Sequence, residues 1–202
     1  MKRETRDKFA SGTKQADLTS GNACWETPPD VFAKLNADFG PFDVDLTADS
    51  QRALCEAWFG PGEASYAHDA ITAAWHTYGR RGYSNPPYGA FVAQMLAKAK
   101  AEASRGFETT LLLPMRVTRA FRAHVLNGAA ELWFCDRRIT FWENGAPRIN
   151  PRTGKPDSAL FDSIVVRYVP GIAGPLQVGV WTVPQERRIH AVAPLFSAQE
   201  IP

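Results

Sequence analysis

The segment SNPPYGAF, residues 84–91, brings together side chains that could orient an aromatic amine for reaction. Proline restricts the residue before it, so Asn85 should be held extended or in a turn, with its amide pointing in one direction. An exocyclic NH2 group is a poor nucleophile because its lone pair is delocalised into the ring. The Asn85 side-chain oxygen and the Pro86 carbonyl could accept its two hydrogens, Tyr88 could stack on the ring, and Pro87 adds rigidity. With a sulfonium methyl as electrophile, no general base is needed.

A stiff strand-to-helix turn without chemistry is the structural alternative for this segment, so its neighbours matter. Periodicity and turn signals predict helices at 27–40, 51–58, 89–106 and 117–128. Strands are predicted at 41–49, 80–84, 108–115, 129–136 and 175–184, with two more inside 138–170 joined by a long loop. This order predicts an α/β sheet with helices on both faces and a β-rich C-terminal part. Right-handed crossovers would place the ends of strands 41–49 and 80–84 on one rim, where ligands usually bind.

Composition bounds the class of protein. A chain of 202 residues suits one domain, and its formal net charge is only +2. Apolar runs are too short for a membrane span, and the basic N-terminus lacks the apolar core of a signal peptide. Cys24, Cys55 and Cys135 form no CxxC pair, and the histidines show no ligand spacing, so neither a disulfide framework nor a metal site is expected. We expect a cytoplasmic protein with a flexible lead at 1–22, one domain at 23–184 and a tail at 185–202.

Several short blocks around the NPPY segment stand in a recognisable order: WETPPDVFAKL, FGPFDVDLTAD, DAITAAW, GYSNPPYGAF, LLLPM and RITFW. Together they resemble the phage-type DNA N6-adenine methyltransferases over roughly residues 25–168. The resemblance implies a Rossmann-like, class I sheet, S-adenosyl-L-methionine as methyl donor, and double-stranded DNA with a flipped adenine as substrate. It also implies a phage or prophage gene expressed in a bacterial host. Either a monomer or a homodimer is compatible with it.

Family positions carry over residue by residue. The catalytic block matches Asn85, Pro86, Pro87 and Tyr88. The strand-end turn for the methionine part of the cofactor matches Asp43, Asp45, Thr47 and Ala48, and the flanking block matches Trp25, Thr27 and Pro28. Asp69 resembles the acid that accepts from the cofactor's adenine amine, and Phe91 would lie near that adenine. Each of the three aspartates could instead cap a turn or a helix.

The chain also departs from the family pattern. A glycine-rich FxGxG turn is absent, and DVDLTAD stands in its place. Only about 40 residues separate this turn from NPPY, so the intervening strands should be short or missing. Glu56 is a candidate for the ribose-binding acid, without a motif to support it.

An arginine-rich loop at 143–159 is the best candidate for DNA contact, although a solvated charged face is the alternative. Guanidinium groups suit phosphates and base edges, and loops of this length tend to be functional. The expected DNA-binding residues, in this loop and beside it, are Arg116, Arg119, Arg137, Arg138, Arg148, Arg152 and Lys155.

The sequence thus predicts transfer of a methyl group to adenine N6 in DNA. Two alternatives stay open: methylation of RNA or of a protein amide, and a non-catalytic DNA-binding relative that has lost its cofactor.

Overall fold

The computed structural model describes residues 25–62, 65–150, 152–172 and 174–185, so the expected flexible lead at 1–22 and nearly all of the tail at 185–202 lie outside the described residues. The helical elements are α1 (Pro29–Phe39), η1 (Trp75–Thr77), α2 (Ala90–Ala103) and η2 (Phe121–Leu126). The strands are β1 (Val44–Asp45), β2 (Ala57–Trp58), β3 (Arg81–Ser84), β4 (Glu108–Pro114), β5 (Glu131–Cys135), β6 (Trp142–Glu143), β7 (Ala146–Pro147), β8 (Ser163–Tyr168) and β9 (Gln177–Trp181).

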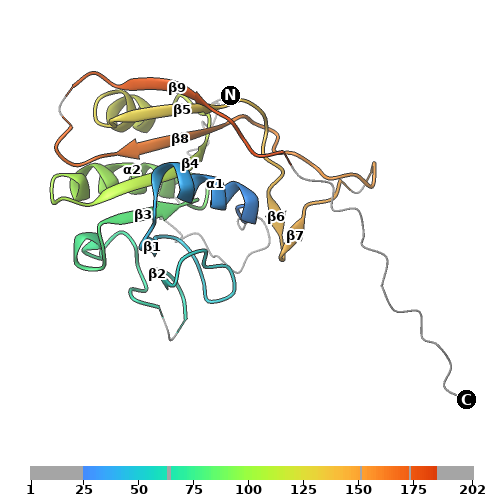
Figure 1. The fold of residues 1–202 in the computed structure, drawn as a ribbon, viewed down its shortest axis with the longest axis horizontal. Coiled ribbons are helices and arrows are strands. Elements are labelled where there is room, and N and C mark those ends of the chain that lie inside the picture. The colour runs from blue at the N-terminus through green and yellow to red at the C-terminus, as the bar shows by residue number, and fades with distance from the viewer. Residues whose placement is uncertain (1–24, 63–64, 151, 173, 186–202) are drawn as a thin grey trace, which may run out of the picture.

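Seven strands form one sheet in the order β2-β1-β3-β4-β8-β5-β9 (Figure 1). β8 runs antiparallel to both of its neighbours, and the other adjacent pairs in this sheet are parallel. β6 and β7 form a separate short hairpin beside the sheet. The predicted α/β sheet with a β-rich C-terminal part is therefore confirmed.

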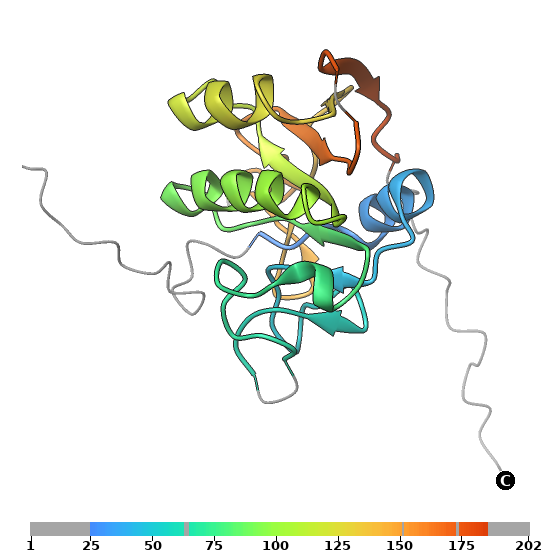
Figure 2. The same cartoon turned by 90° about the vertical axis from the view of Figure 1, so that its left-hand side faces the viewer.

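Helices cover both faces of the sheet, as predicted: α2 and η2 lie on one face and α1 lies on the other (Figure 2). Successive side chains of a strand point to opposite faces, so a strand in such a layer must be apolar on both sides. In β4, Leu111 and Leu113 belong to the core beneath α2, whereas Leu112 belongs to the core beneath α1. This is why β4 reads as a continuous apolar run.

The first strands carry the expected rim. Asp45 ends β1 opposite Tyr83 of the parallel neighbour β3, so the segments after both strands leave the same edge of the sheet. The hydroxyl oxygens of Thr47, which follows β1, and of Ser84, the last residue of β3, lie 2.6 Å apart and connect these two strand ends. Gly89 then adopts a φ of 115°, which side-chain-bearing residues rarely adopt, and α2 begins at the next residue.

Three expected elements differ in the structure. A helix at 51–58 is wrong: the amide of Leu54 donates to the Asp45 carboxylate instead of continuing a helical turn, and Ala57–Trp58 pairs with β1 as strand β2. The helix expected at 117–128 contains a π-helical segment, η2. The loop at 143–159 is not free of regular structure, because the β6–β7 hairpin takes up its first part. Strands between 49 and 80 are indeed short, with β2 spanning two residues.

Candidate active site

A pocket lies at the carboxyl ends of β1 and β3 and is lined by both predicted and unpredicted residues. The predicted residues that the structure brings together here are Trp25, Thr27, Asp45, Thr47, Ala48, Asn85 and Pro87. The pocket is also lined by Glu26, Asp49, Arg52, Leu54 and Tyr83. Its cavity volume of about 60 Å³ leaves room for a few water molecules, so it suits the size of a small polar group.

The Asn85 amide is held in one orientation by the segment that precedes α1. Its Nδ2 donates to the Trp25 carbonyl at 2.7 Å and to the Thr27 hydroxyl at 3.2 Å. A carbonyl oxygen can only accept, so the amide atom facing Trp25 must be the NH2 group. Both of its hydrogens are then engaged, and the carbonyl oxygen of the amide stays available as an acceptor.

A pair of buried hydroxyl groups supports this arrangement. The hydroxyl oxygens of Thr27 and Tyr83 lie 2.7 Å apart, and the two residues are 6% and 1% exposed. Burial raises the pKa of Tyr83 well above its ordinary value, so this phenol stays protonated. A neutral hydroxyl therefore faces Thr27 at every physiological pH.

Asp45 supplies a buried carboxyl at the floor of the pocket. It is 4% exposed and accepts from the backbone amides of Thr47, at 3.3 Å, and Leu54, at 3.2 Å. Desolvation raises the pKa of Asp45 to about 6, and these two hydrogen bonds offset the rise in part. No cation pairs with this carboxyl among the described residues. A positively charged group in the pocket would therefore be attracted to it.

Arg52 also lines the pocket, although no sequence motif pointed to it. Its guanidinium pairs with Glu26 at 3.1 Å and with Asp49 at 3.2 Å. Glu26 also accepts from the amide of Gly145 at 2.9 Å, which ties the pocket to the β6–β7 hairpin. Both acidic partners of Arg52 belong to sequence blocks already connected with the site: Glu26 to WETP and Asp49 to DLTAD. Their position in these blocks was the sequence signal that could have pointed to them.

Tyr88 lies beside the pocket in an aromatic cluster made of Trp25, Tyr88, Phe141 and Phe161. Its ring packs edge-on against Trp25 at 6.1 Å and Phe161 at 5.3 Å between centroids. Its hydroxyl is buried and has no hydrogen-bond partner among the described residues. Burial raises the pKa of Tyr88, although nearby Arg116 opposes the rise. Pro86 is buried and does not line the pocket.

Five other residues considered for the cofactor site lie outside the pocket. Asp43 sits at the amino end of β1, where its Oδ2 accepts from the amides of Arg80 and Arg81 at 2.7 and 2.9 Å. Asp69 accepts from the amide of Ile71 at 2.8 Å, which is the capping alternative. The remaining three are Pro28, which is buried at the start of α1, Phe91, which packs against the core beneath α2, and Glu56, which is exposed.

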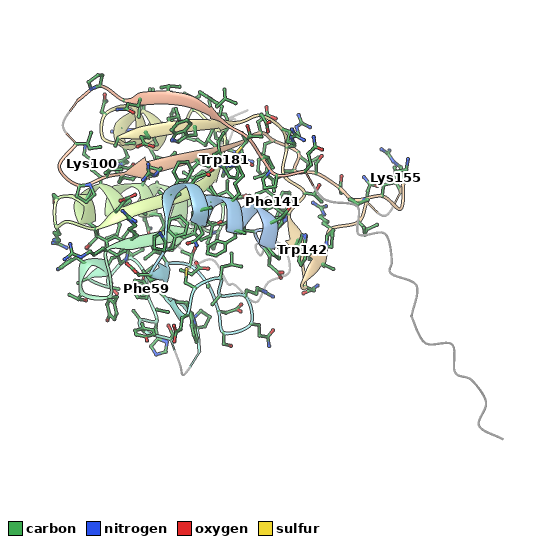
Figure 3. All side chains as sticks on the ribbon, in the orientation of Figure 1. Phe59, Lys100, Phe141, Trp142, Lys155 and Trp181 are labelled. Carbon is green, nitrogen blue, oxygen red and sulfur yellow. The ribbon has the colours of Figure 1, made fainter. Side chains whose placement is uncertain are left out.

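The predicted DNA-binding residues fall into two groups. Arg148 and Arg116 lie against the aromatic cluster, with their guanidinium carbons 5.2 Å from the Trp25 ring and 5.7 Å from the Phe161 ring. Lys155 lies on the loop that projects beyond the sheet (Figure 3). The other members of the set are all exposed: Arg119, Arg152, Arg137, which pairs with Asp136, and Arg138, which pairs with Asp162.

Neither a metal cluster nor a membrane helix is found in the part of the chain that the structure describes. No three or more His, Cys, Asp or Glu side chains are grouped there in a way that could hold a metal ion. None of the helices described is long and apolar enough to cross a membrane.

The mostly parallel sheet, with its polar pocket at the carboxyl ends of β1 and β3 beside an Asn-Pro-Pro-Tyr turn, is consistent with a Rossmann-like methyltransferase fold. A family model described as DNA N-6-adenine-methyltransferase (Dam) matches residues 14–172. The chain belongs to this family. It is also similar to a protein of Escherichia coli (strain K12) named "Putative methyltransferase YfdM", with 36% identity over 64 residues, which are 32% of this chain and 69% of that protein. The family resemblance predicted from the sequence is thereby confirmed.

Proposed function

We propose that this protein transfers a methyl group from S-adenosylmethionine to the N6 amine of adenine in DNA. The observation that carries this proposal is the orientation of the Asn85 amide. Its two N–H hydrogens are taken up by Trp25 and Thr27, which leaves the oxygen to accept a hydrogen from a substrate amine. An acceptor held in place in this way would favour the geometry in which the amine lone pair is free to react.

The pocket fits the amino-acid end of the proposed cofactor. A buried, uncompensated Asp45 carboxyl suits an ammonium group, and the hydroxyls of Thr27 and Thr47 suit a carboxylate or ammonium through hydrogen bonds. S-adenosylmethionine would supply the electrophilic methyl group when bound. Asp43, Pro28, Asp69 and Phe91 are left out of this proposed site because they lie outside the pocket.

Residues of this chain would perform three tasks in the reaction. Asn85, with the Pro86 carbonyl, would accept the amine hydrogens. Tyr88 would contact the ring of the target base, because it is the aromatic residue of the same turn. The proline pair would keep both acceptors rigid. The lone pair of the neutral amine would attack the methyl group directly, with the carbon–sulfur bond breaking as the carbon–nitrogen bond forms and S-adenosylhomocysteine leaving. No side chain needs to remove a proton before the transfer, and the cationic product amine would lose its proton to solvent.

Double-stranded DNA with a flipped adenine is the proposed substrate, and the arginine-rich side of the molecule is the proposed contact surface. Arg116 and Arg148 lie next to Tyr88 and Trp25, so phosphates or bases bound there would be near the catalytic turn. Three further cationic side chains are exposed and therefore accessible to phosphate groups: Lys155, Arg152 and Arg119.

Methyl transfer from labelled S-adenosylmethionine to unmethylated duplex DNA tests this function directly. We expect label in N6-methyladenine with the wild type and none with Asn85→Ala. Gln177→Ala, which removes an amide on the far edge strand β9, is the matched control and should retain full activity. Label in RNA or protein and none in DNA would overturn the choice of substrate. Absence of both methyl transfer and cofactor binding by calorimetry would overturn the enzyme proposal as a whole.

A further inference from the structure

The side chain of Asn85 has two orientations that differ in chemical meaning. Rotation of the amide by 180° exchanges its oxygen and its NH2 group, and the terminal torsion of asparagine has no strong preference of its own. With the NH2 group toward the substrate, donor would face donor, and the amine could not be held. The neighbours of Asn85 therefore decide whether the site can work.

Two neighbours favour the productive orientation. The Trp25 carbonyl lies 2.7 Å from Nδ2, and the opposite orientation would place two acceptor oxygens at that short distance. The Thr27 hydroxyl accepts the second hydrogen at 3.2 Å. Both neighbours belong to one three-residue segment that precedes α1, although they are about 60 positions from Asn85 in the chain.

Thr27 is itself held by a hydrogen bond to a residue of β3, the strand that leads to Asn85. The hydroxyl of Tyr83, two residues before Asn85, lies 2.7 Å from the Thr27 hydroxyl, and both side chains are buried. If Thr27 donates to Tyr83, both of its remaining bonding directions are acceptors, which suits Asn85. If Tyr83 donates, the Thr27 hydrogen is free to point into the pocket that both residues line.

The segment is also anchored on its other side. The backbone of Glu26 exchanges two hydrogen bonds of 2.9 Å with Trp142 of β6, and this pairing sets the position of the Trp25 carbonyl. The acceptors for the Asn85 amide are therefore fixed by β3 on one side and by the β6–β7 hairpin on the other.

We propose that Thr27 is a positioning residue for the Asn85 amide, and that the buried Tyr83 hydroxyl holds Thr27 in place. This inference rests on the proposed function, because the productive orientation is defined by an amine substrate. It assigns to Thr27 a task distinct from contact with the cofactor. Its hydroxyl, and not its methyl group, performs that task.

The test uses Thr27→Val, which keeps the shape and removes the hydroxyl, and Thr27→Ser, which keeps the hydroxyl. Single-turnover methyl transfer is measured at saturating cofactor and DNA, so that weaker cofactor binding does not enter the rate. We expect Thr27→Val to be about 10- to 100-fold slower, because a misplacement of about 1 Å can cost about 100-fold in rate, and Thr27→Ser to recover to within about threefold. Tyr83→Phe should slow the rate by a smaller factor. Equal rates in Thr27→Val and the wild type would overturn the proposal, as would equally slow Val and Ser variants.

A second measurement does not depend on activity. The NH2 group of Asn85 gives a side-chain signal in nitrogen-15 NMR spectra, assigned by its loss in Asn85→Ala. We expect its hydrogens to exchange with solvent at least about tenfold faster in Thr27→Val than in the wild type or Thr27→Ser, because one of two hydrogen bonds is lost. Unchanged exchange would overturn the positioning role even if the enzyme is active. Faster exchange in a protein without methyl transfer would retain the positioning role and overturn the proposed function. Urea unfolding of each variant confirms that it is folded.

Discussion

The buried carboxyl of Asp45 leads to a prediction about both stability and cofactor binding. Its pKa is raised by desolvation from 3.8 to about 6, so between these values the native protein binds more protons than the unfolded chain. Stability therefore falls as the pH rises through this window. At neutral pH, ionised Asp45 costs roughly 3 kcal/mol relative to the unfolded chain, at about 1.4 kcal/mol for each pH unit between the two pKa values.

Asp45→Asn removes this cost and keeps the shape of the side chain. The amide has one acceptor oxygen, whereas the carboxylate accepts from both Thr47 and Leu54, so one backbone hydrogen bond is lost at a cost of about 1 kcal/mol. At pH 7.5 we expect a net gain of about 1–2 kcal/mol in the free energy of unfolding. Near pH 4.5 most of the gain disappears, because the wild-type carboxyl is then protonated in the native state.

Urea unfolding of both proteins from pH 4.5 to pH 7.5 measures this difference. The other titrating groups are common to both proteins and largely cancel, so the difference in unfolding free energy should grow by about 2 kcal/mol across the range. A difference that does not change with pH would refute the reasoning, because it would mean that Asp45 ionises in the native state as easily as in the unfolded chain.

The same substitution should weaken cofactor binding, because an ammonium group in the pocket needs the ionised carboxylate. Calorimetry with S-adenosylmethionine should show wild-type affinity falling by up to about tenfold for each pH unit below 6, and Asp45→Asn should bind weakly without that dependence. Asp43→Asn is the matched control: it is an exposed aspartate two residues away that also accepts from two backbone amides, at the opposite end of the strand. Its cofactor affinity should equal that of the wild type.

Two further predictions concern DNA binding and the core. Lys155→Ala should weaken binding to duplexes of any sequence and reduce the slope of log affinity against log salt by about 0.9 in fluorescence anisotropy, whereas Lys100→Ala, at the opposite end of the molecule (Figure 3), should not. An unchanged slope for Lys155→Ala would remove this loop from the DNA interface. Glu102 has a buried side chain that pairs with Lys98 and His76, each at 2.8 Å, and with Arg105 at 3.0 Å. Glu102→Ala removes these contacts but leaves partners that still reach solvent, so it should lower the free energy of unfolding by about 1.5–3 kcal/mol. Arg105→Ala, whose side chain is 54% exposed, should cost less than about 1 kcal/mol in the same urea assay; similar losses in both would contradict the role of burial.

Much of the architecture was predictable because it follows from neighbours along the chain. The apolar run of β4, the helical spacing of α2 and the proline pair after β3 are local patterns, and parallel strands bring their carboxyl ends to one edge. The helix expected at 51–58 failed for a non-local reason. The amide of Leu54 donates to the carboxylate of Asp45, nine residues earlier, and Ala57 pairs with Val44 of β1. Local propensity cannot anticipate either partner.

The chemistry of the site was decided by tertiary structure. The NPPY motif indicated Asn85 as the acting residue, but the orientation of its amide depends on Trp25 and Thr27. The oxygen and the NH2 group of the side chain can exchange places until an acceptor beside them fixes which one faces it. In the sequence, Asp43 and Asp45 are two aspartates of the same predicted strand, two residues apart. The fold separates them, leaving Asp43 exposed at the amino end of β1 and burying Asp45 beside the pocket, where loss of solvent raises its pKa. Sequence by itself determined which residues could act, and burial and long-range hydrogen bonds determined which of them are placed to do so.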